Sequence, residues 1–191
     1  MYPEYVNKLI SISSGYKLST LQTLHNLEQA YILDLGRESN NRNNEYLSLA
    51  RMIAHKTYIS LELLSNRAKS ETLYDDDLIK GFLSTPQESY MMHQGEKFIE
   101  RFTPESYLSI IKGWQNFKIE QKDLNKLKDI ETLVISVDSD VCFYPEEQKE
   151  FLEILNNHEI RTTYTTINST KGHDSFLLEP ELFEDTLKNF L

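Results

Sequence analysis

Residues 133–143 read LVISVDSDVCF, an apolar run that ends in two aspartates separated by a serine. A short run rich in Val, Ile and Leu is typical of a strand that is buried on both faces of a parallel sheet. We expect this strand to cover about 132–138, and Asp140 follows it directly. Because open α/β sheets bind ligands at the carboxyl ends of their strands, Asp140 is a candidate site residue.

Two further segments have the composition of strands. KLISISS at 8–14 interleaves Leu and Ile with Ser, and IRTTYTTINS at 160–169 is rich in β-branched residues. Helices are expected at 145–157 and after Pro180, where glutamates suit the positive end of a helix dipole. A strand, a long helical block and then alternating strands and helices predict an α/β fold with a parallel sheet and right-handed crossovers.

The long block between the first two strands has a helical pattern. Apolar residues of the segment 44–67 return at a three-to-four spacing. Thr85 is followed by a proline and then by Glu88, which together predict a capping box at a helix start, and Thr103 opens a second Thr–Pro start. We therefore divide the chain into three parts: 1–16 with the first strand, 17–117 as a helical lid inserted into the sheet, and 118–191 with the remaining strands and helices.

Composition places the chain among globular proteins. It has 191 residues, of which 39% are hydrophobic, and a formal net charge of −10. This charge and the scattered Lys and Arg argue against a nucleic-acid partner, and the acidic run YDDDL at 74–78 is interpreted as a solvated helix edge. No apolar run approaches the about 20 residues that span a bilayer, and MYPEYVNK at the start is not a secretory signal. We expect a soluble, cytoplasmic protein with no membrane partner.

A histidine accompanies the aspartate in the next strand-to-helix connection. In STKGHDSFLLE, residues 169–179, Gly172 permits a tight turn that would aim the ring of His173. A carboxylate can hold the tautomer of a histidine and stabilise the imidazolium form, so Asp140 and His173 are candidates for the acid and base of a nucleophilic triad. The other four histidines are interpreted as structural or exposed: His25, His55, His93 and His158.

Other kinds of site receive less support. His173 and Asp174 are adjacent and diverge, and no second histidine stands at ligand spacing, so no metal site is expected. The single cysteine, Cys142, excludes an internal disulfide and favours a reducing compartment. Its place at a strand end is better explained by packing than by a role as nucleophile.

The serine of a triad of this architecture normally lies in a G-x-S-x-G turn ahead of the acid and the histidine. The six glycines are too widely spaced to form that motif. We therefore expect the nucleophile to belong to sequence that precedes Met1.

Five stretches resemble, in order, the C-terminal part of the homoserine O-acetyltransferases: YPEYVNKLISIS, LARMIAHKTY, ESYMMHQGEKFIERFTPESYL, TLVISVDSDVCF and STKGHDSFLLE. The resemblance implies the C-terminal part of an α/β-hydrolase parallel sheet with a large helical lid insertion. It also implies that the half with the serine turn and the oxyanion hole is missing.

The same resemblance implies roles for individual residues. Asp140 and His173 would be the triad acid and base, and Arg51 of the lid would hold the carboxylate of the amino acid. Tyr58 and Asp174 would be further pocket residues, with Asp174 near the substrate amine. The implied activity is acyl transfer from acetyl-CoA or another acyl-CoA to homoserine in methionine biosynthesis, with no permanently bound cofactor. The intact family member would be a homodimer through its lid helices.

Several alternatives stay open from the sequence. The donor could be acetyl or succinyl, and the acceptor homoserine or serine. An esterase of the same fold, or a non-catalytic remnant acting as an interaction module, would retain the same residues. We expect the chain alone to be inactive and to self-associate, with an unpaired edge on its first strand and partial exposure of Leu9, Ile10, Leu133 and Ile135.

Overall fold

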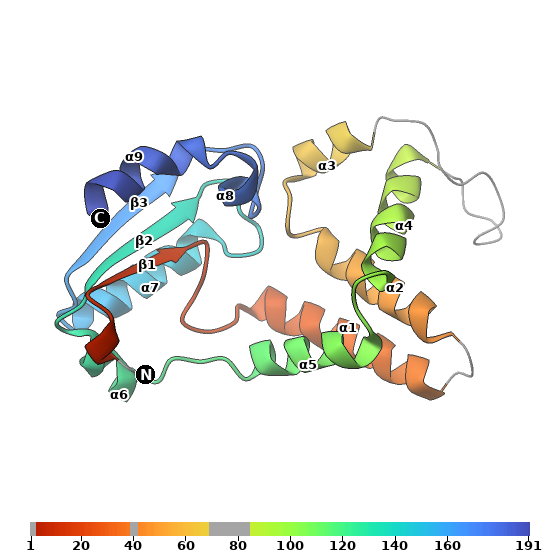
Figure 1. Ribbon diagram of the computed structural model, residues 1–191, viewed down its shortest axis with the longest axis horizontal. Coiled ribbons are helices and arrows are strands. Elements are labelled where there is room, and N and C mark those ends of the chain that lie inside the picture. Colours follow the sequence, from red (N-terminus) through yellow and green to blue (C-terminus); the bar gives the residue numbers. More distant parts are fainter. Residues whose placement is uncertain (1–2, 39–41, 69–84) are drawn as a thin grey trace. The chain divides into compact units, whose positions relative to one another are not determined.

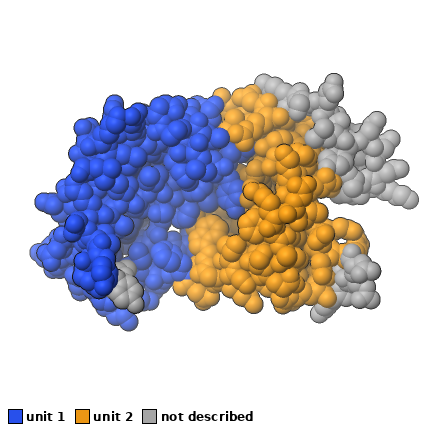
Figure 2. Space-filling view, viewed as in Figure 1, with its two compact units in different colours: residues 1–19, 57–60, 117–191 blue, residues 20–56, 61–116 orange. Residues whose placement is uncertain are grey.

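The computed structural model describes residues 3–38, 42–68 and 85–191 (Figure 1). The acidic run at 74–78 lies outside these residues. Two compact units make up the chain (Figure 2). One contains Met1–Ser19, Thr57–Ser60 and Phe117–Leu191, and the other contains Thr20–Lys56 and Leu61–Asn116. The three-part division drawn from the sequence stays a proposal.

A three-stranded parallel sheet is the centre of the first unit. Its strands are β1 (Lys8–Ile12), β2 (Glu131–Val137) and β3 (Thr162–Ile167), in the order β1-β2-β3. This confirms the predicted α/β class with parallel pairing. The first strand is shorter than expected because Ser13 has a φ of 44°, which is outside the conformation of a strand.

Helices cover both faces of this sheet (Figure 1). Val134 packs on one face with the apolar side of α7 (Pro145–Asn157). Leu133, Ile135 and Val137, which flank Val134 at every second position, point to the other face. There they pack with Phe183 and Phe190 of α9 (Glu181–Phe190). This alternation follows from the two-residue period of a strand.

The side-chain exposure expected from the sequence is confirmed for β1 and wrong for the central strand, β2. Leu9 and Ile10 of β1 are partly exposed, and in the described structure β1 pairs only with β2, so its other edge is unpaired. Leu133 and Ile135, by contrast, are 1% and 0% exposed. The reason is that β2 lies between two neighbours and beneath helices on both faces, so three strands are enough to bury the middle one.

Short helical segments and one bridge complete the first unit. They are the 3₁₀ turns η1 (Pro3–Tyr5) and η2 (Asn125–Leu127) and the short helices α6 (Gln121–Leu124) and α8 (Ser175–Leu178). Where the chain leaves this unit and returns to it, Lys17 and Lys118 form an antiparallel bridge. The Ile119 N–H donates to the Tyr16 carbonyl at 2.8 Å, so the two ends of the helical block are adjacent.

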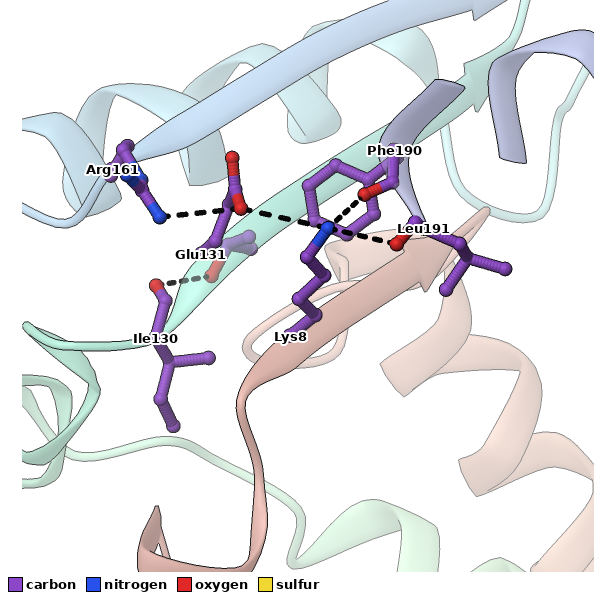
Figure 3. Close-up of polar contacts among 7 residues, drawn as sticks. Lys8, Ile130, Glu131, Arg161, Phe190 and Leu191 are labelled. Carbon is purple, nitrogen blue, oxygen red and sulfur yellow. Dashed lines mark hydrogen bonds and ion pairs between the residues drawn. The ribbon is translucent and has the colours of Figure 1, made fainter. Parts of the chain in front are cut away.

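A polar cluster ties the amino ends of the strands to the last helix (Figure 3). The Lys8 ammonium donates to the carbonyl of Phe190, and to that of Leu191 at 3.2 Å. Glu131 lies 3.2 Å from Arg161 and 3.9 Å from Lys8. These contacts hold the C-terminal end of α9 against the amino ends of the strands. Asp140 follows the carboxyl end of β2, at the opposite end of the sheet.

The second unit is helical. Its elements are α1 (Thr20–Glu38), α2 (Asn43–His55), α3 (Leu61–Arg67), α4 (Pro86–Ile99) and α5 (Pro104–Gln115). Both expected helix starts are confirmed: Thr85 forms a capping box with Glu88, and Thr103 forms one with Ser106. The buried core consists of Leu33, Leu47, Ala50, Phe98, Tyr107, Leu108 and Ile111. Within the described residues no helix is long and apolar enough to cross a bilayer.

Candidate active site

Asp140 occupies the turn that follows β2, with its side chain completely buried. One carboxylate oxygen, Oδ1, accepts the backbone N–H groups of Cys142 at 2.7 Å and Phe143 at 2.8 Å. The other, Oδ2, lies 3.0 Å from Nδ1 of His173. Hydrogen bonds to a charged acceptor are strong, so this network fixes the direction of the carboxylate.

The structure therefore brings together the acid and the base that the sequence predicts. In neutral His173 the Nδ1–H donates to Asp140, which leaves the lone pair on Nε2. The histidine side chain is 18% exposed. An imidazole held in this way can accept a proton at Nε2 while the carboxylate stabilises the positive charge that results.

Three aromatic side chains surround the imidazole ring. Phe143 stacks on it with centroids 5.5 Å apart, and Phe176 meets it edge-on at 5.6 Å. Tyr58 lies at 6.4 Å, so the structure places this predicted pocket residue beside the histidine. The rings restrict the rotation of the imidazole about its side-chain bonds.

Residues that sequence reasoning did not single out connect the two loops of the site. Oδ1 of Asp138 accepts the Ser169 N–H at 2.9 Å. The Ser139 hydroxyl donates to the Ser169 carbonyl and accepts the Gly172 N–H at 3.0 Å. Each residue of the DSD turn, Asp138–Asp140, thus bonds to the histidine loop, residues 169–174. The signal available in the sequence was a run of polar side chains at the end of a buried strand.

Asp174 lies in the same loop, and its backbone N–H donates to the Tyr58 carbonyl at 2.8 Å. Its side chain is half-buried. Asp174 and Tyr58 are therefore neighbours of His173, and their roles toward a substrate remain predictions.

Arg51 belongs to the other unit, where α2 carries it. Its guanidinium donates to Nδ1 of His55 at 3.3 Å and stacks over the ring of Phe98 at 5.0 Å. Burial above all, with the positive charges of Arg51 and Arg67, lowers the pKa of His55 to about 4. His55 is consequently neutral near pH 7 and can accept from Arg51. The role of Arg51 toward a substrate carboxylate remains a prediction.

The described residues add little else that could catalyse a reaction. No hydroxyl or thiol among them hydrogen-bonds to Nε2 of His173. Cys142 is a free cysteine and is buried. His158 donates from Nδ1 to the Ile154 carbonyl at 2.8 Å, a structural contact. Residues 3–38, 42–68 and 85–191 contain no cluster of acidic, His or Cys side chains that could hold a metal ion.

Comparison with known proteins identifies relatives by sequence. No family model matches the chain. A homoserine O-acetyltransferase of Methanosalsum zhilinae is 35% identical over 204 residues, which cover 100% of this chain and 41% of that enzyme. One of Pelagibacter ubique is 35% identical over 159 residues, or 80% of this chain and 43% of that enzyme. The chain thus spans about two fifths of the length of the curated relatives it matches.

Solved structures show the same fold. A homoserine O-acetyltransferase from Bacillus anthracis superposes with a TM-score of 0.84 at 14% identity, over 99% of this chain and 54% of that one. Esterase E22 superposes with a TM-score of 0.83 at 15% identity, over 99% and 55%. The relatives found by sequence and the structures found by fold both include homoserine O-acetyltransferases, the family that the five sequence stretches resemble. The chain belongs to the homoserine O-acetyltransferase family of the α/β-hydrolase fold.

Proposed function

We propose that this chain supplies the acid and base of an acyltransferase that moves an acyl group from an acyl-CoA, such as acetyl-CoA, to the hydroxyl of homoserine. The observation that carries the proposal is the buried Asp140, which bonds to Nδ1 of His173 at 3.0 Å and leaves Nε2 as the acceptor. The serine nucleophile lies in polypeptide outside these 191 residues, in keeping with the share of the relatives that the chain covers.

The reaction proceeds through an acyl-enzyme. His173 Nε2 takes the proton of the serine as its oxygen attacks the thioester carbon, and the imidazolium returns that proton to the departing thiolate of CoA. The homoserine hydroxyl then gives its proton to Nε2 as its oxygen attacks the acyl carbon of the acyl-enzyme. The imidazolium returns that proton to the departing serine oxygen, which releases the ester and regenerates the serine and the neutral histidine. Asp140 keeps Nδ1 protonated and stabilises the imidazolium in both halves.

Residues outside the pair have proposed roles in substrate binding. Arg51 binds the substrate carboxylate, Asp174 binds the amine, and Tyr58 lines the acceptor pocket. The neutral His55 supports Arg51, since a protonated ring could not accept from the guanidinium. No resident cofactor is part of this proposal.

The test is homoserine-dependent release of CoA by the chain combined with the remainder of the protein. Asp140→Asn and His173→Ala should each lower kcat by about 10³- to 10⁴-fold. Asp185→Asn is the matched control, because this carboxylate is exposed on α9. The 191-residue chain by itself should release no CoA. Full activity of the double variant Asp140→Asn/His173→Ala would refute the proposal.

The same assay separates the alternatives. A hydrolase would cleave acyl-CoA or a simple ester at the same rate with and without homoserine, because water replaces the acceptor. A non-catalytic interaction module would show no turnover in the presence of the remaining polypeptide. The similarity to esterase E22 concerns the fold alone.

We also propose that the complete protein is a homodimer through its helical unit and acts in the cytoplasm. An exposed apolar stripe on α1, at the spacing of one helix face, supports the dimer: Leu24, Leu27, Tyr31 and Leu35 are 51%, 62%, 62% and 42% exposed. The single cysteine, Cys142, agrees with a reducing compartment.

A further inference from the structure

Residues Thr57–Ser60, called the strap below, connect α2 to α3 and yet pack within the sheet unit, against the histidine loop. The Ser60 N–H donates to the Lys171 carbonyl at 3.2 Å, and the Ser60 hydroxyl donates to the Thr170 carbonyl. From the other side, the Asp174 N–H donates to the Tyr58 carbonyl at 2.8 Å. Three hydrogen bonds therefore join two segments about 110 residues apart in sequence.

Gly172 allows this close approach. A Cβ added there would lie 2.5 Å from the backbone nitrogen of Ser60 and 2.9 Å from the carbonyl carbon of Ile59. Gly172 also has a φ of 77°, a conformation that side chains with a Cβ rarely adopt. Ile59 is fully buried, which anchors the middle of the strap. Neither backbone could move apart without losing these contacts.

His173 lies between the residues that the strap holds. Lys171 and Asp174 bond to the strap on either side of it, while the Gly172 N–H bonds to Ser139 of the DSD turn. The Tyr58 ring faces the imidazole at 6.4 Å. The histidine loop is thus fixed by the DSD turn on one side and by the strap on the other.

We propose that the strap is a positioning element for His173, with Ser60 of the strap and Gly172 of the histidine loop as the positioning residues. The helical block then contributes to the reaction through a segment that holds the base in line with Asp140. The inference rests on the proposed role of His173 as the base. Small displacements of a catalytic group by about 1 Å can lower a rate about 10²-fold, so the strap should affect kcat rather than substrate binding.

The experiment compares Gly172→Ala and Ser60→Ala with the wild-type chain and with Ser109→Ala. Ser109 is the matched control, because its hydroxyl also donates to a backbone carbonyl, that of Glu105, on the exposed face of α5. The first readout is the NMR signal of the His173 Nδ1–H in the ¹⁵N-histidine-labelled chain. A proton bonded to Asp140 is protected from exchange with water, and this readout requires no enzymatic activity.

We expect the signal to persist in the wild type and in Ser109→Ala, to exchange faster in Ser60→Ala, and to vanish in Gly172→Ala. In the chain combined with the remainder of the protein, Gly172→Ala should lower kcat about 10²-fold and change KM for homoserine less than about threefold. If Gly172→Ala does not fold, Ser60→Ala decides by the same two readouts. Wild-type exchange and kcat in Ser60→Ala, or in a folded Gly172→Ala, would overturn the inference. If the Nδ1–H signal is lost in the Gly172 and Ser60 variants but the wild type shows no turnover, the proposed function is refuted. The inference that the strap positions His173 would then still hold.

Discussion

At the scale of single residues, two histidines have partners of opposite charge: His173 contacts a carboxylate and His55 contacts a guanidinium. His173 donates from Nδ1 to the buried carboxylate of Asp140, which would stabilise a positively charged ring in the proposed proton transfer. His55 is 5% exposed and contacts Arg51, and its pKa is lowered to about 4 by burial first and by positive charge second. A neutral His55 can hold the guanidinium of Arg51, whereas a protonated one would repel it.

This setting predicts a pH dependence of stability. A histidine with a depressed pKa in the folded state binds a proton more readily after unfolding, so its contribution is fully present above about pH 6.5 and is lost as pH falls toward about 4. We expect the wild type to lose about 2 kcal/mol more unfolding free energy than His55→Asn over that range, after allowance for solvent screening. Urea unfolding at several pH values measures the difference, and parallel curves for the two proteins would contradict it.

At the scale of elements, two helices of the second unit begin with the same device. The side-chain hydroxyls of Thr85 and Thr103 each accept a hydrogen bond from the backbone N–H of the residue three positions later. Each threonine is followed by a proline at the first position of the helix. The cap satisfies donors that the first turn of a helix cannot pair internally. Both signals act within a few residues, which explains why their positions could be predicted from the sequence.

Thr85→Ala should therefore lower the free energy of unfolding by about 1 kcal/mol, because it removes the acceptor for the Glu88 N–H. Thr85→Ser retains the hydroxyl and serves as the control, with a loss of at most a few tenths of a kcal/mol. The urea midpoint reports the change. Equal midpoints for the Ala and Ser variants would show that the bond from the Glu88 N–H to the Thr85 hydroxyl contributes nothing.

At the scale of the whole molecule, helices cover both faces of the sheet, but within the described structure its two outer strands, β1 and β3, each have one unpaired edge. Helices on both faces bury β2, whereas β1 pairs on one side only within the described structure. Unpaired strand edges and exposed apolar stripes both promote association. The chain presents both, the first at β1 and the second on α1.

Charge placed on the α1 stripe should therefore change the mass of the protein in solution. We expect the wild type to associate and the double variant Leu27→Glu/Tyr31→Glu to shift toward the monomer in light scattering. Leu177→Glu is the control, because Leu177 is 68% exposed on α8 and lies off the stripe. If both variants keep the wild-type mass, the association uses another surface, and the β1 edge becomes the first to test.

The sequence by itself determined what short segments control: a buried strand before Asp140, two capped helix starts, and a histidine after a glycine in the next connection. Only the tertiary structure decided how distant segments meet. It showed that Leu133 and Ile135 are fully covered, that Asp138 and Ser139 cross-link the site, and that the strap holds the histidine loop. The physical reason is that burial and long-range hydrogen bonds depend on partners about 30 to 110 residues away, which no local pattern encodes.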